Sequence, residues 1–129
     1  MNYIESQPGS SPHFEQRTEY MYVRIDGSGV DYNEQKECWE KIAEEFNRSS
    51  HFRLMVEQRS GQGLDMSDAF QLSTEIAQMG FEDCKAAYVD PNEKNIEVNE
   101  FAEVVAINRG FNGKTFTNIE DAEAWLLSN

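Results

Sequence analysis

Two cysteines and two histidines are the residues of this chain best suited to nucleophilic catalysis. Cys38 or Cys84 could act as a nucleophile if His13 or His51 lay beside it as a base. Cys38, however, falls on the apolar stripe of a predicted helix and Cys84 begins a predicted interior strand, positions where a cysteine acts as a small hydrophobic side chain. The two cysteines also match no metal-binding spacing. We therefore expect two buried thiols, no disulfide and no catalytic residue.

Charged and hydroxyl side chains follow two predicted strands and could form a site at the edge of the sheet. Arg59 comes shortly after one strand, Asp90 directly follows the next, and Asp65 and Ser67 begin the helix between them. Polar side chains at the carboxyl ends of parallel strands are typical of α/β binding and catalytic sites. Asp90 also precedes Pro91, where an aspartate favours a simple turn. A sheet-edge site and a structural turn therefore remain two open interpretations.

The same region contains no recognisable cofactor or metal motif. The loop Gly61-Gln62-Gly63 could let backbone N–H groups approach an anion, but it fits neither glycine-rich nucleotide-binding spacing, and Asp65 would repel phosphate. The carboxylates lack both a histidine partner and the spacing of a calcium-binding loop. We therefore expect no cofactor and no metal.

Hydrophobic periodicity and turn residues predict the elements that must hold these side chains. Five strands are expected at 13–18, 20–25, 52–56, 84–89 and 114–117. Four helices are expected around 34–46, 65–80, 94–109 and 117–127, and a Thr117 and Glu120 capping box begins the last one. The order ββαβαβαβα predicts an α/β fold with a mostly parallel five-stranded sheet and an antiparallel first strand. Residues 1–12 are expected to be a flexible leader, and 13–129 a single domain.

Charge and hydropathy argue against several kinds of partner. The chain carries 24 acidic and 11 basic residues and a formal charge of −13, which repels nucleic acid and anionic membranes. Its first residues lack the pattern of a signal peptide, and no apolar run reaches the ~20 residues of a membrane span. We expect a soluble, cytoplasmic protein with no nucleic-acid partner and no membrane partner.

The two faces of the predicted sheet differ in composition. Alternation along the second and third strands gives one wholly apolar face, which consists of Met21, Val23, Ile25, Phe52, Leu54 and Val56. If every connecting helix covers that face, the opposite face stays partly open, unless long side chains or the leader cover it. Tyrosine, arginine and methionine on such a face are enriched at protein interfaces. The expected interaction surface consists of Tyr20, Tyr22, Arg24, Arg53, Met55 and Glu57.

A family resemblance rests on the order of elements and on three segments, Phe101-Ala102-Glu103, Asn108-Arg109-Gly110-Phe111-Asn112-Gly113 and Ala122-Glu123-Ala124-Trp125-Leu126-Leu127. The chain resembles the STAS superfamily of bacterial anti-sigma-factor antagonists over residues 14–128, and most closely a bacterial STAS or CRAL-TRIO-like branch. The resemblance implies a singly wound sheet whose strand order follows the chain, without the switch point where open α/β sheets commonly bind ligands. It also implies a phosphorylated residue near Ser67, although the family's serine and glycine pair is Ser67-Asp68 here.

The expected function is that of a non-catalytic binding or regulatory module that acts through a protein partner or as a homodimer. A second possibility, in line with the CRAL-TRIO resemblance, is a carrier of a small apolar molecule or lipid. Its cavity would lie between the second and third helices, open at the loop around Gly61, and be lined by Met66, Phe70, Phe101 and Val105. A third possibility is an enzyme with carboxylates near Asp90.

Overall fold

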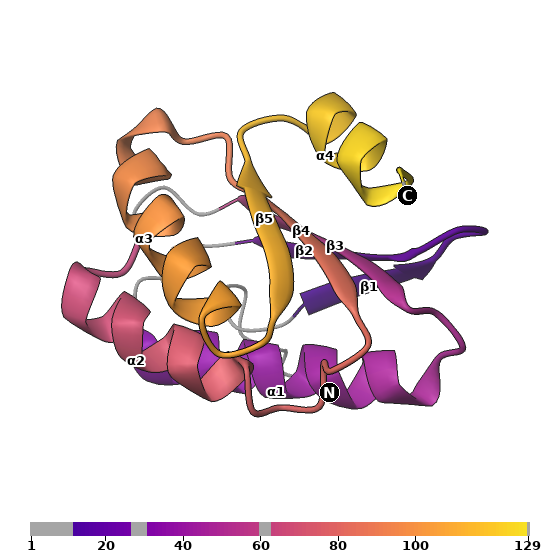
Figure 1. Ribbon diagram of the computed structural model, residues 1–129, viewed down its shortest axis with the longest axis horizontal. Helices are drawn as coiled ribbons and strands as arrows, with labels where there is room; N and C mark the ends of the chain where they lie inside the picture. Colours follow the sequence, from indigo (N-terminus) through magenta and orange to yellow (C-terminus); the bar gives the residue numbers. More distant parts are fainter. Residues whose placement is uncertain (1–11, 27–30, 60–62, 129) are drawn as a thin grey trace, which may run out of the picture.

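The computed structural model describes residues 12–26, 31–59 and 63–128. These residues form five strands and four α-helices in the order ββαβαβαβα, with one 3-10 turn, η1 (Glu93–Asn95), before the third α-helix. The strands form one sheet in the order β1-β2-β3-β4-β5, so the expected α/β fold and singly wound sheet are confirmed (Figure 1). The predicted leader, except Pro12, and the loop around Gly61 lie outside the described residues.

The sheet consists of one antiparallel hairpin followed by parallel strands. β1 pairs antiparallel with β2, as the sequence predicts, and every later pair is parallel. The strand bounds are Pro12–Gln16 for β1, Met21–Asp26 for β2, Arg53–Arg59 for β3, Lys85–Val89 for β4 and Asn112–Phe116 for β5.

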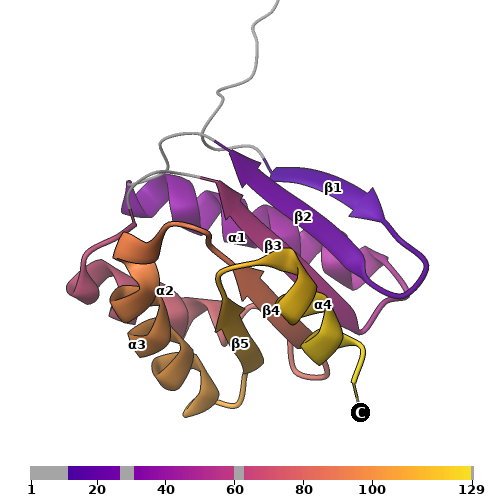
Figure 2. The ribbon, with the colours of Figure 1, turned by 90° about the horizontal axis from the view of Figure 1, so that it is seen from above.

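Helices α1, α2 and α3 cover one face of the sheet, and α4 covers the other (Figures 1 and 2). Their bounds are Tyr32–Arg48 for α1, Met66–Ile76 for α2, Ile96–Ile107 for α3 and Ile119–Leu126 for α4. Parallel neighbours need right-handed crossovers, which put α1 to α3 on the same side of a sheet wound in one direction. Because α4 follows the last strand, no such rule fixes its side.

Aspartate and asparagine side chains begin three of the α-helices. Asp65 accepts a hydrogen bond of 2.8 Å from the backbone N–H of Asp68, so the predicted start of α2 is confirmed. The cap of α4 is Asn118, whose Oδ1 accepts from the Asp121 N–H over 2.8 Å. The Asn118 amide nitrogen also donates to the Asp121 carboxylate over 3.1 Å. The capping box predicted at Thr117 and Glu120 is therefore wrong by one residue, because Asn118 and Asp121 form these contacts instead.

α4 closes the sheet face that we expected to be open. Tyr20, Tyr22 and Met55 are 3%, 5% and 0% exposed in the cluster that this helix covers. The Tyr20 hydroxyl also donates to the Glu123 carboxylate of α4 over 2.8 Å. The interaction surface expected from the sequence is therefore wrong for these three residues, because a helix of the same chain already covers them.

The remaining members of that surface are half-buried and form local contacts. Arg24 pairs with Asp26 over 2.9 Å, and Glu57 pairs with Arg59 over 3.2 Å. Arg53 places its guanidinium 4.9 Å from the centroid of the Phe52 ring. The assignment of Phe52 to the core face is also wrong, because it precedes β3 and is 59% exposed.

Candidate functional site

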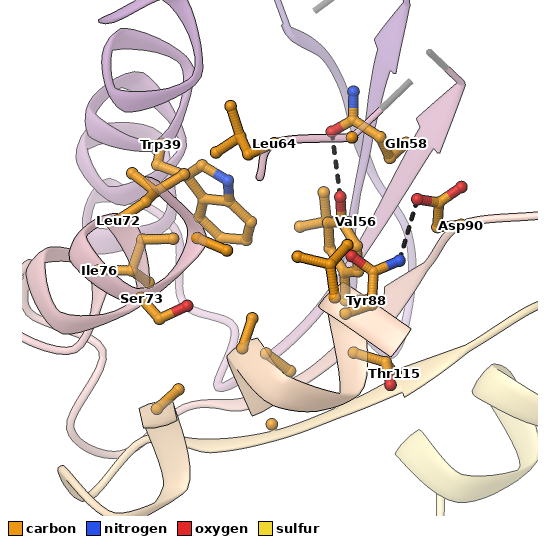
Figure 3. Close-up of a pocket in the computed structure, with 18 of the residues that line it drawn as sticks. Trp39, Val56, Gln58, Leu64, Leu72, Ser73, Ile76, Tyr88, Asp90 and Thr115 are labelled. Atoms are coloured by element: carbon orange, nitrogen blue, oxygen red, sulfur yellow. Dashed lines mark hydrogen bonds between the residues drawn. The ribbon is translucent and has the colours of Figure 1, made fainter. Parts of the chain in front are cut away.

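A partly enclosed cavity of about 130 Å³ lies between α2, α3 and the sheet (Figure 3). Small residues line it on several sides, with Ala69 on α2, Ala102 and Ala106 on α3, Ala86 on β4 and Gly113 on β5. Protein interiors are normally packed as densely as organic crystals, so larger side chains would be expected to fill such a space. The cavity therefore results from the small residues that the chain has at these facing positions.

The walls of the cavity are apolar and partly aromatic. Leu72 and Ile76 line it from α2, and the rings of Trp39 and Tyr88 lie 6.3 Å apart between their centroids. Phe111 lines the end nearest β5, where a Cβ on Gly113 would come within 2.5 Å of the Phe111 ring. Gly113 is therefore needed for Phe111 to occupy this place.

One end of the cavity is polar and lies at the carboxyl ends of β3 and β4. Gln58 and Asp90 line this end and are each only 3% exposed. The Tyr88 hydroxyl donates to Gln58 Oε1 over 3.3 Å (Figure 3). Removal of that hydroxyl from water raises the pKa of Tyr88, and the nearby Asp90 charge and Cys38 raise it further. Tyr88 is therefore a neutral hydrogen-bond donor at physiological pH.

Asp90 is the centre of the polar network at this end. Its Oδ2 accepts from the side-chain amides of Asn95 and Asn99 at 3.0 Å each, and its Oδ1 accepts from the Asn92 N–H at 3.1 Å. The bond to Asn92 is the turn contact that the sequence predicts for an aspartate before proline. The turn interpretation is therefore confirmed, but it describes only one of the three bonds.

Asn95 links Asp90 to the segment before α2. Its Oδ1 accepts from the Gly63 N–H over 3.1 Å, while its amide nitrogen donates to Asp90. A Cβ on Gly63 would lie 3.0 Å from that same oxygen, so a larger residue would strain the contact. Asp90 and Asn95 thus hold the chain on both sides of the polar end, after β4 and before α2.

Two polar groups at the cavity have no hydrogen-bond partner among the described residues. Ser73 is only 7% exposed, and its hydroxyl points from α2 into the cavity (Figure 3). Asn99 must turn its amide nitrogen toward the Asp90 carboxylate, which can only accept, so its carbonyl oxygen remains available. Both groups can bond to a molecule inside the cavity.

The cavity borders the second and third helices, but the four residues expected to line it do not do so. Met66, Phe70 and Phe101 are 44%, 45% and 37% exposed, and Val105 is buried without lining the cavity. Phe70 and Phe101 stack on each other on the outer side, with ring centroids 6.4 Å apart. The error is in the rotation of α2 about its own axis. The stripe that faces inward is the adjacent one, which consists of Ala69, Leu72, Ser73 and Ile76.

The sheet-edge residues predicted to act together are not brought together around Asp90. Asp65 caps α2, and Arg59 pairs with Glu57. Ser67 is exposed in the first turn of α2, and no hydrogen bond or ion pair joins it to Asp90 within the described part of the chain. Sequence reasoning missed Gln58, Ser73, Asn95 and Asn99, although a serine in the inward stripe of α2 was a usable signal.

Both cysteines are buried, as predicted. Burial raises the pKa of Cys38 to about 11 and that of Cys84 to about 12, so neither thiol provides a thiolate nucleophile at neutral pH. Among residues 12–26, 31–59 and 63–128, no group of three or more His, Cys, Asp or Glu side chains could hold a metal ion.

The described residues define an α/β protein with a mixed five-stranded sheet and a partly enclosed, mainly apolar cavity. No protein-family model and no curated protein matches the chain. Within the described residues, none of the helices has the length and apolar character needed to cross a membrane.

Proposed function

We propose that this chain is a non-catalytic binding module that holds a small, mainly apolar molecule between α2, α3 and the sheet. The observation that carries the proposal is a cavity of about 130 Å³ bordered by small residues from four elements. Leaving such a volume empty costs on the order of 3 kcal/mol, at ~24 cal/mol per Å³. A bound molecule would offset this cost.

The volume limits the size of the molecule. An engineered apolar cavity of ~150 Å³ binds benzene, and the cavity of this chain has about 130 Å³. A molecule with a single ring therefore matches the space, whereas a long lipid chain exceeds it. The polar end at Asp90 favours a molecule that has one polar group.

The topology also supports a relationship to the STAS superfamily. The strand order β1-β2-β3-β4-β5 is the one that the resemblance implies. A module of this kind, acting in the cytoplasm without catalysing a reaction, fits both the fold and the cavity.

Toluene binding tests the proposal. The full chain should show a saturable rise in melting temperature with toluene, together with NMR shifts at residues that line the cavity. Ala106→Leu fills the cavity from α3, where Ala106 is 8% exposed, and should abolish the response. Ala124→Leu is the matched control on the exposed side of α4 and should respond like the wild type. An equal response in Ala106→Leu, or no response in the wild type, would contradict the proposal.

Self-association or binding to a protein partner is a second candidate function, now supported by a different surface. Met66, Phe70, Phe101 and Val104 of α2 and α3 are 37–55% exposed, and large apolar patches on soluble proteins often mark interfaces. Light scattering on the wild type and on Phe70→Asp tests the self-association form. A wild-type dimer that Phe70→Asp converts to a monomer supports it, and a monomeric wild type counts against it.

A further inference from the structure

We infer that Asp90 makes the cavity selective for small ring-sized amines in their protonated form, with the carboxylate as counter-ion of the ammonium group. This inference rests on the proposed function, since it requires that the cavity binds a molecule. It adds the chemical class of the polar group. Three observations carry it: the unused acceptor capacity of Asp90, the absence of a neutralising cation, and the free hydroxyl of Ser73.

The Asp90 carboxylate can accept one more hydrogen bond. An ionised carboxylate has about four acceptor positions, two on each oxygen. Within the described residues, Oδ2 accepts from the Asn95 and Asn99 amides and Oδ1 accepts only from the Asn92 N–H. One position on Oδ1 therefore remains, on a side chain that lines the cavity.

No cation of the described chain neutralises Asp90. All three of its donors are uncharged, and no lysine, arginine or histidine lies within ion-pair distance of it in residues 12–26, 31–59 and 63–128. Lys114 also borders the cavity, but its side chain lies on the α4 side of the sheet. Side chains two apart on a strand share a face, and Phe116 packs against the cluster under α4. Lys114 Nζ lies 6.0 Å from the centroid of the Phe116 ring. Of the two charged residues in the described lining, Asp90 is thus the one whose side chain lies at the cavity (Figure 3).

A buried charge without a counter-ion distinguishes strongly between ligands. Charges interact more strongly away from water, so an ammonium beside Asp90 is favoured and a carboxylate is repelled. The formal charge of −13 on the whole chain acts in the same direction by attracting cations to the protein. The Ser73 hydroxyl lies on the α2 wall, across the cavity from Asp90 (Figure 3), and provides a polar contact for a substituent on the ring.

The test compares four probes of nearly the same shape on the full chain at neutral pH: benzylamine, benzyl alcohol, toluene and benzoate. Binding is followed by NMR titration of residues that line the cavity. We expect benzylamine to bind at least tenfold more tightly than benzyl alcohol, and benzoate at least tenfold more weakly. Asp90→Asn should remove the preference for benzylamine while toluene affinity stays within threefold. Asp83→Asn, which removes an equal charge from an exposed loop, should leave the order of the probes unchanged.

The outcomes separate this inference from the proposed function. If toluene binds but benzylamine binds no better than benzyl alcohol, the inference fails and the cavity remains a binding site. If none of the probes binds, both fail. Should Asp90→Asn not fold, the order of the four probes on the wild type still decides, because equal affinities for benzylamine and benzoate exclude a counter-ion role for Asp90.

Discussion

The two faces of the sheet are built from the same strands but are filled to different degrees. On the α4 face, large side chains of β2 and β3 meet α4, and Tyr22, Met55 and Leu126 are at most 5% exposed. On the opposite face, small residues of α2, α3, β4 and β5 meet each other and leave about 130 Å³ unfilled. The difference lies in side-chain volume at facing positions rather than in topology.

Polar contacts reinforce the contrast. On the α4 face they fasten the helix, since Lys85 Nζ donates to the backbone carbonyls of Trp125 and Ser128 over 2.8 Å each. On the cavity face, Asp90 and Asn95 join the segment after β4 to the segment before α2 at the polar end of the cavity. Ser73 has no hydrogen-bond partner among the described residues. One face is thus filled and fastened, and the other keeps an unfilled space.

Leucine truncation on the two faces should give the largest effect. Leu126→Ala opens a new cavity beneath α4 and should lower the free energy of unfolding by about 4 kcal/mol. Leu72→Ala only enlarges the space already present and should cost about 2.5 kcal/mol. Urea denaturation of both variants measures the difference, and a larger loss for Leu72→Ala would contradict the comparison.

Removal of the Asp90 carboxylate should have the next largest effect. Asp90→Ala leaves the amides of Asn95 and Asn99 and the Asn92 N–H without their acceptor, which should cost about 2 kcal/mol of unfolding free energy. Asp83→Ala on the exposed loop is the control, with an expected change below about 0.5 kcal/mol. If the two variants are equally stable, the network does not hold the polar end together.

Alkaline pH should lower the free energy of unfolding through Cys84, which is buried in the filled part of the cavity face. Its thiol titrates near 9.0 when exposed, and burial raises the pKa to about 12 in the fold. The raised pKa means that the fold holds the neutral form, so the stability from Cys84 is present below pH 9.0 and is lost as the pH rises toward 12.

Between pH 8 and pH 10 the wild type should therefore lose about 1.4 kcal/mol more unfolding free energy than Cys84→Ala. Chemical denaturation at the two pH values gives both losses. Equal losses in the two proteins would show that the thiol titrates in the fold as it does in the unfolded chain.

Much of the fold could be predicted because strands, helices and turns have local signals. The five strands, the antiparallel hairpin and the Asp65 cap follow from alternation, helical spacing and side-chain chemistry. The side of the sheet taken by α4 could not be predicted, since no crossover rule governs a helix after the last strand. The open surface at Tyr20 and Tyr22 was expected for this reason alone.

The candidate site was harder to predict because it depends on helix rotation and on empty space. Met66 and Phe70 are larger apolar residues than Ala69 and Ser73, yet the stripe that contains Ala69 and Ser73 faces inward. Hydrophobicity predicts which residues prefer burial, but not that small residues from several elements will meet. The network of Asp90 likewise joins residues whose individual signals were those of a turn and a helix start.

The central claim, that the α4 face is filled while the opposite face keeps an unfilled space, is tested most directly by the same substitution on both faces. Ala106→Leu adds volume to the cavity and should raise the free energy of unfolding by about 1 kcal/mol. Ala122→Leu adds it beneath α4, where Ala122 is 0% exposed, and should lower that free energy by about 2 kcal/mol. Urea denaturation of the two variants beside Ala124→Leu should thus give opposite signs, and a similar loss in both would contradict the account.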